Sequence, residues 1–119
     1  MIELQAKALR TFIPARNFAL SKDFYTAIGG TIVWSNENLA LIHFANSTFY
    51  LQNHYVKDWA ENSMLHLAVD DAATCFAELK KILSTLDFPT ARVEAPKREA
   101  YGALVTYLWD PSGVLWHFA

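Results

Sequence analysis

The sequence is poor in the features that mark secreted, membrane and nucleic-acid-binding proteins. It has one cysteine, Cys75, so no disulfide can form within the chain, and we expect a protein of the reducing cytoplasm. Residues 1–12 show no hydrophobic core of a signal peptide. No apolar run approaches the roughly 20 residues of a membrane span, so no membrane partner is expected. The net charge of −2, without a basic stripe, argues against nucleic acid as a partner.

Motifs of catalytic chemistry are missing as well. There is no serine–histidine–acid arrangement, no phosphate-binding loop and no zinc-ligand spacing. Apolar residues, in contrast, make up 53% of the 119 residues, and aromatic residues make up 14%. A chain of this length and composition is expected to form one compact domain with a substantial core.

The first half of the chain has the periodicity of a strand, a helix and three more strands. We expect an extended run over Leu9–Ala15 at a sheet edge, because Pro14 has no N–H to donate. Asn17 is a suitable cap for a helix that Gly29 and Gly30 end. The turn residues that follow delimit three predicted strands, at 31–35, 39–44 and 48–52.

The second half repeats this order at an offset of about 54 residues. We expect a strand over 64–69 and a helix capped by Asp70 and Asp71, followed by strands at 91–94, 103–109 and 114–118. The repeat predicts an α+β fold made of two βαβββ modules in a single domain over 1–119. Module 1 spans about 1–53, a linker spans 54–63, and module 2 spans about 64–119.

Three motifs resemble those of the vicinal oxygen chelate superfamily, which includes glyoxalases, extradiol dioxygenases, fosfomycin-resistance enzymes and bleomycin-resistance proteins. The similarity lies in PARNFALSKDFYTAIGG around the first helix, LAVDDA before the second helix, and DPSG before the last strand. It covers nearly the whole chain. FYLQN and the Trp-His-Phe ending are most similar to the bleomycin-resistance branch.

The resemblance implies that each module curls its mixed sheet into half of a cup, and that two copies form a homodimer with two half-barrel clefts. Helices would cover the outer faces and ligands would lie on the concave ones. Strand alternation then directs Val114, Trp116 and Phe118 into the core, with Leu115 and His117 in the cleft. The predicted ligand-binding residues are Arg10, Phe12, Tyr50, Met64, His66, Tyr107, Trp109 and His117, together with Trp59 of the linker. For Tyr50, His66, Tyr107, Trp109 and His117 the alternative is an ordinary core or strand residue, and for Trp59 it is packing across the dimer.

The resemblance also implies four metal positions, which usually hold His or Gln, Glu, His and Glu. Here these positions correspond to Arg10, Tyr50, Met64 and His117. A guanidinium has no lone pair to donate, and a thioether is a poor ligand for a hard ion. A shift of register would exchange Met64 for His66 without supplying a carboxylate. We therefore expect neither a metal nor another cofactor.

An aromatic groove with two histidines and an arginine, and with no paired carboxylates, suits a planar molecule. The expected function is therefore metal-free binding that sequesters a planar or drug-like aromatic compound, as the bleomycin-resistance proteins do. Those proteins bind a cationic antibiotic in an acidic groove. Since the charge of this chain is nearly balanced, we do not expect bleomycin itself as the ligand. The alternative is a glyoxalase-like, metal-dependent lyase, transferase or dioxygenase with its ligands elsewhere.

Overall fold

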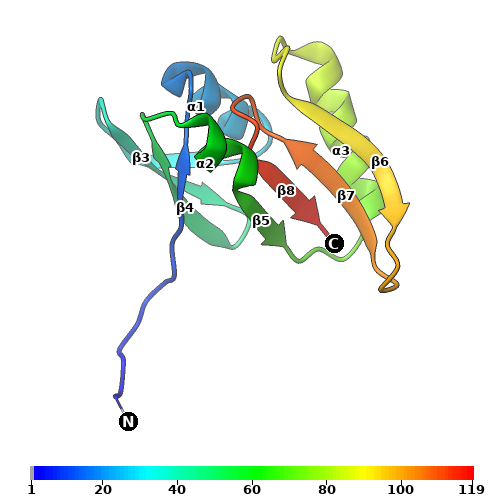
Figure 1. Cartoon of the computed structure of the whole chain (residues 1–119), viewed down its shortest axis with the longest axis horizontal. Coiled ribbons are helices and arrows are strands. Elements are labelled where there is room, and N and C mark those ends of the chain that lie inside the picture. Colours follow the sequence, from blue (N-terminus) through cyan, green and yellow to red (C-terminus); the bar gives the residue numbers. More distant parts are fainter. Residues whose placement is uncertain (1) are drawn as a thin grey trace.

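The computed structural model describes residues 2–119, which form two four-stranded sheets flanked by helices (Figure 1). Module 1 consists of β1 (Phe12–Pro14), α1 (Phe18–Ala27), β2 (Thr31–Ser35), β3 (Leu39–Phe44) and β4 (Ser47–Gln52). Module 2 consists of β5 (Met64–Leu67), α3 (Ala72–Thr85), β6 (Arg92–Arg98), β7 (Leu104–Trp109) and β8 (Leu115–Phe118). A short helix, α2 (Lys57–Asn62), connects them. None of the helices within residues 2–119 has the length and apolar character of a membrane span.

The two sheets share one topology. Their strand orders are β1-β4-β3-β2 and β5-β8-β7-β6. The first strand of each module runs parallel to the last strand, and the remaining pairs are antiparallel. The α+β fold of two βαβββ modules, predicted from the internal repeat, is therefore confirmed.

The two long helices begin at predicted caps. The side chain of Asn17 accepts a hydrogen bond from the backbone N–H of Leu20 at 3.1 Å. The carboxylate of Asp71 accepts a hydrogen bond of 3.0 Å from the backbone N–H of Ala73. Each bond satisfies an N–H group that has no partner within the first helical turn. The helix α1 ends before Gly29, whose φ of 109° is a conformation that glycine adopts without a steric penalty.

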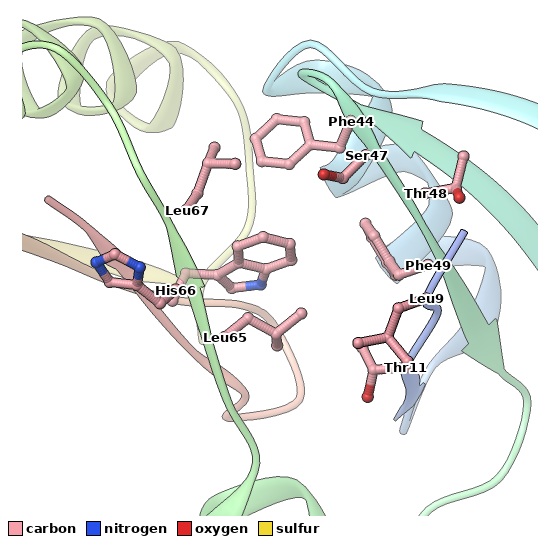
Figure 2. Close-up of a pocket in the computed structure, with 10 residues that line it drawn as sticks. Leu9, Thr11, Phe44, Ser47, Thr48, Phe49, Leu65, His66 and Leu67 are labelled. Atoms are coloured by element: carbon pink, nitrogen blue, oxygen red, sulfur yellow. The ribbon is translucent and has the colours of Figure 1, made fainter. Parts of the chain in front are cut away.

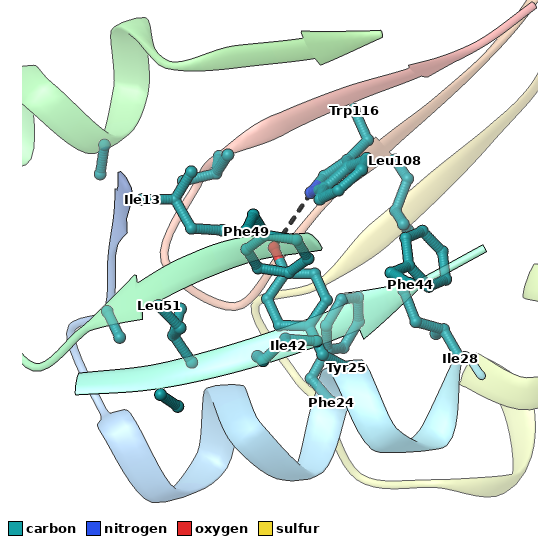
Figure 3. Close-up of a cluster of buried hydrophobic side chains, with 14 of the residues drawn as sticks. Ile13, Phe24, Tyr25, Ile28, Ile42, Phe44, Phe49, Leu51, Leu108 and Trp116 are labelled. Carbon is teal, nitrogen blue, oxygen red and sulfur yellow. Dashed lines mark hydrogen bonds between the residues drawn. The ribbon is translucent and has the colours of Figure 1, made fainter. Parts of the chain in front are cut away.

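One hydrophobic core joins the two modules (Figure 3). The ring of Trp116 on β8 lies 5.5 Å from that of Phe49 on β4 and 5.4 Å from that of Phe44 on β3. Tyr25 of α1 packs against Phe49 and Trp116 from the side of module 1. Each sheet therefore turns one face toward the other module, and its opposite face points outward.

Several predicted strand boundaries differ from the observed ones by one or two residues, and two boundaries differ by more. The first strand begins at Phe12 and not at Leu9, because the ladder between this segment and β4 begins at Phe12. The strand predicted to end at Glu94 continues to Arg98, with a shift of register between Glu94 and Lys97 that accommodates Pro96. The linker over 54–63 also contains the helix α2, which the sequence did not indicate.

Candidate functional site

The predicted cleft residues lie on the face of each sheet that points away from the core shared by the two modules. On β4, Phe49 points into the core, so its neighbour Tyr50 points outward. On β8, Trp116 is buried and His117 points outward. The module 1 face carries Arg10, Phe12, Trp34, Leu41 and Tyr50. The module 2 face carries Met64, His66, Tyr107, Trp109, Leu115 and His117.

Within one chain these two faces point away from the shared core and do not meet. Figure 2 shows the arrangement on β5, where Leu65 and Leu67 point toward module 1 and His66 points to the other side. Among residues 2–119, no aromatic ring of one face packs against a ring of the other face. The structure thus brings the predicted residues together as two half-sites.

The module 1 face is an exposed aromatic surface. Phe12 stacks on Tyr50 with ring centroids 4.7 Å apart, and the ring of Trp34 lies 6.2 Å from Tyr50. Nε of Arg10 donates a hydrogen bond of 2.8 Å to the hydroxyl of Thr48, which holds the guanidinium 5.9 Å from the Tyr50 ring centroid. Phe12 is 49% exposed and Trp34 is 42% exposed, so flat apolar rings are available for contact.

The module 2 face is centred on Tyr107. Its ring lies edge to face with the imidazole of His117, with centroids 4.9 Å apart, and 6.2 Å from the ring of Trp109. The guanidinium of Arg92 stacks over Trp109 at 3.9 Å from the ring centroid. The register of β6 and β7 places Arg92 directly opposite Trp109, so strand pairing positions this stack.

Two carboxylates that were not predicted in the cleft lie beside Tyr107. Glu94 is directly opposite Tyr107 across β6 and β7, and Glu99 accepts a hydrogen bond of 2.8 Å from its hydroxyl. This bond, burial and the charge of Glu99 raise the pKa of Tyr107 to about 12. Each carboxylate thus contacts or faces Tyr107, and the two were not among the predicted ligand-binding residues. Because side chains alternate along a strand, Glu94 lies on the same face as Arg92, and the sequence could have indicated this position. The contact of Glu99 with Tyr107 depends on the register of β6 on β7, which the sequence does not show.

The two histidines of the module 2 face are direct neighbours. His66 on β5 and His117 on β8 are partners in the parallel ladder. Burial and the nearby His66 lower the pKa of His117, although Glu99 acts in the opposite direction. The imidazole of His117 is therefore neutral near pH 7. Nε2 of His117 is buried without a hydrogen-bond partner within residues 2–119. A buried polar atom without a partner destabilises the folded state by about 1–3 kcal/mol.

Trp59 lies on the helix α2 and not on a strand of either face. Its ring centroid is 6.4 Å from that of His54, and its carbonyl oxygen accepts a hydrogen bond of 2.7 Å from the hydroxyl of Ser63. Within the described part of the chain, Trp59 makes no ring contact with either face.

The side chains at the four implied metal positions do not fit a metal ion. Arg10 and Tyr50 lie on one face, while Met64 and His117 lie on the other. The guanidinium of Arg10 cannot donate a lone pair, which leaves the imidazole of His117 as the one good donor of the four. Across residues 2–119, no group of three or more His, Cys, Asp or Glu side chains is placed to hold a metal.

No protein-family model and no curated protein matches the sequence. Solved structures are similar in fold. A bleomycin-binding protein complexed with bleomycin is 21% identical, with a TM-score of 0.79 over 95% of this chain and 97% of that chain. A bleomycin resistance determinant encoded on the transposon Tn5 is also 21% identical, with a TM-score of 0.78 over 95% of this chain and 96% of that chain.

A third structure, the bleomycin-binding protein from Streptomyces verticillus complexed with copper(II)-bleomycin, is 13% identical. Its TM-score is 0.81, and the match covers 98% of both chains. The chain therefore has the fold of bleomycin-binding proteins, as the resemblance in its motifs predicted.

Proposed function

We propose that this protein binds and sequesters a planar or drug-like aromatic molecule, without a metal and without converting it. The observation that carries this proposal is the pair of outward aromatic faces, one built on Phe12, Trp34 and Tyr50 and the other on Tyr107 and Trp109. Solved structures with the same fold are complexed with bleomycin, which supports the binding of a small molecule.

The chemistry of the faces favours stacking. Aromatic pairs contribute about 0.5–1.5 kcal/mol beyond the burial of their surface. Phe12 and Trp34 on module 1 are partly exposed, and Tyr107 and Trp109 on module 2 present their rings side by side. A flat ligand held between two such surfaces would stack on both of its sides.

A cleft lined by both faces requires a second copy, because the faces lie on opposite sides of one chain. In a two-fold homodimer, the module 1 face of one copy opposes the module 2 face of its partner, and symmetry generates two equal clefts. The exposed apolar side chains of Phe12, Trp34 and Met64 are the surface that such pairing would cover. The homodimer is therefore part of the proposal.

The charges on the two faces balance, which bears on the class of ligand. Arg10 lies on the module 1 face, and Arg92, Glu94 and Glu99 border the module 2 face. With His117 neutral, the formal charges of these four groups sum to zero. We therefore expect a ligand of low net charge and do not propose bleomycin itself.

Tryptophan fluorescence tests the proposal directly. The protein is titrated with a panel of planar antibiotics and aromatic metabolites, and binding is expected to quench Trp34 and Trp109. His117→Ala should weaken the best ligand by up to about tenfold, the equivalent of one hydrogen bond. His54→Ala removes a histidine whose ring lies near Trp59 and near no aromatic ring of either face, and it should change the affinity by less than about twofold.

Two results would contradict the proposal. One is a panel without any ligand, and the other is equal weakening by the two histidine variants. The pH profile adds a further check. Because the pKa of His117 is below its ordinary value of about 6.5, the affinity should be flat from about pH 7 to about pH 8 and change only under more acidic conditions.

A further inference from the structure

A polar cavity lies at the end of the module 2 face, where β6 begins and β7 ends. Its volume is about 320 Å³. The residues that line it are Glu61, Thr90, Arg92, Trp109 and Gly113. They come from the helix α2, the loop before β6, the first position of β6, the last position of β7 and the turn before β8. The cavity therefore adjoins the aromatic face through Trp109, which belongs to both.

Hydrogen bonds hold together the segments that surround this cavity. The hydroxyl of Thr90 donates a hydrogen bond of 2.8 Å to the carbonyl oxygen of Pro111, which ties the loop before β6 to the turn before β8. The carbonyl oxygen of Ser63, directly after α2, accepts a hydrogen bond of 3.1 Å from the N–H of Leu115. The three segments are thus joined through the turn and the start of β8, and they present their side chains to one space.

The cavity carries one charge of each sign. The guanidinium of Arg92 lies 3.9 Å from the ring centroid of Trp109 and stays positively charged. Of its five N–H donors, one is engaged, in a contact of 3.5 Å with Glu94. This contact is the one ion pair within residues 2–119, so Glu61 has no cationic partner there. A carboxylate and a guanidinium therefore line the same cavity without neutralising each other.

This placement of charge selects between classes of polar group. The ammonium group of a dipolar ion would bind the carboxylate of Glu61, and its carboxylate would accept N–H donors from Arg92, whose planar fork matches a carboxylate. A simple amine would bind Glu61 but meet the like charge of Arg92. A simple acid would bind Arg92 but meet the like charge of Glu61. A group that carries both charges is the one that satisfies both side chains.

We propose that this cavity binds the amino-acid head group of a ligand whose aromatic ring packs against Tyr107 and Trp109. The proposal rests on the proposed function and names its class of ligand, an aromatic α-amino acid or a compound that carries such a head group. The rings of Tyr107 and Trp109 lie side by side, with centroids 6.2 Å apart. An α-amino acid has no net charge, in agreement with the balanced charges of the two faces.

Three indoles with different head groups test this proposal. L-tryptophan carries both charges, tryptamine carries the ammonium group alone, and indole-3-propionate carries the carboxylate alone. Isothermal titration calorimetry should show that L-tryptophan binds at least about tenfold more tightly than either analogue. Equal affinities for the three indoles would overturn the proposal, and so would the absence of measurable L-tryptophan binding.

Two variants assign the preference to its side chains. Glu61→Gln should weaken L-tryptophan by at least about tenfold without weakening indole-3-propionate, since the acid makes no favourable contact with Glu61. Arg92→Gln should weaken L-tryptophan equally without weakening tryptamine. A general loss of structure would weaken all three indoles together, so this crossed pattern separates recognition from a structural role. Wild-type ratios among the three indoles in both variants would overturn the proposal.

Matched controls remove the same charges from the same elements outside the cavity. Asp58→Asn lies on α2 and Lys97→Gln lies on β6, and neither residue lines the cavity. Each should change the affinity for L-tryptophan by less than about twofold. The fluorescence titration with planar compounds distinguishes the two failures. If planar compounds bind and the three indoles bind equally, head-group recognition is wrong and the proposed function stands, whereas both are wrong if no planar compound binds.

Discussion

The hydroxyl of Tyr25 on α1 donates a hydrogen bond of 2.6 Å to the carboxylate of Asp110, in the turn before β8. The other carboxylate oxygen accepts the backbone N–H groups of Ser112 at 2.8 Å and Val114 at 3.0 Å. Nε1 of Trp116 donates to the Tyr25 hydroxyl at 3.0 Å (Figure 3). This buried network ties module 1 to module 2 at the centre of their shared core.

Asp110 makes the stability of the protein depend on pH. Burial raises the pKa of Asp110 from 3.8 to about 6, so the folded protein holds this proton more tightly than the unfolded chain. The resulting stabilisation is complete below about pH 4 and is lost as the pH rises through about 6. Relative to Asp110→Asn, the free energy of unfolding of the wild type should therefore fall by about 3 kcal/mol between pH 4 and pH 7.5.

Urea unfolding at both pH values measures this difference, and the comparison with the variant cancels the titration of all other groups. Asp23→Asn, which removes an exposed carboxylate from the same helix as Tyr25, is the control. A difference between wild type and Asp110→Asn that stays constant with pH would contradict the prediction.

Tyr25→Phe should destabilise the protein by about 1–3 kcal/mol, because it leaves Oδ2 of Asp110 and the Trp116 N–H without a partner in the core. Tyr50→Phe is the matched control. The Tyr50 hydroxyl makes no hydrogen bond within residues 2–119, so its removal should change stability by less than about 0.5 kcal/mol. If urea unfolding showed the same loss of unfolding free energy in Tyr25→Phe and Tyr50→Phe, the hydroxyl of Tyr25 would not stabilise the core.

Glu99→Gln should lower the pKa of Tyr107 from about 12 toward its ordinary value of about 10, because the carboxylate that disfavours the phenolate is gone. Ultraviolet titration of phenolate absorbance, with Tyr107→Phe subtracted, isolates this one tyrosine. Glu94→Gln should have a smaller effect, since Glu94 acts through its charge alone. No change in Glu99→Gln would mean that the hydrogen bond is not formed in solution.

Divalent zinc, nickel or manganese should leave the melting temperature unchanged, because Arg10, Tyr50, Met64 and His117 offer no suitable set of ligands. A specific ion at a hundredfold excess over its dissociation constant would stabilise the folded state by about 2.7 kcal/mol. Differential scanning calorimetry would detect such an increase. A rise with one ion that disappears in His117→Ala would restore the metal-dependent alternative.

The sequence by itself determined the order of the main strands and helices and the direction of their side chains, although it did not indicate the helix α2. The strands β2 and β3 have the predicted bounds, and Asn17 and Asp71 cap the helices as expected. Alternation on the last strand correctly directed Trp116 into the core and His117 away from it. These features depend on residues a few positions apart, so local periodicity and capping chemistry suffice to predict them.

Tertiary structure alone decided which distant residues meet. The register of β6 on β7 places Glu94 opposite Tyr107, and the irregularity near Pro96 precedes the turn from which Glu99 reaches the tyrosine hydroxyl. The packing of Trp116 against Phe49 turns the two aromatic faces to opposite sides of the chain. Pairing between strands far apart in sequence sets these relations, so neither strand's own pattern encodes them.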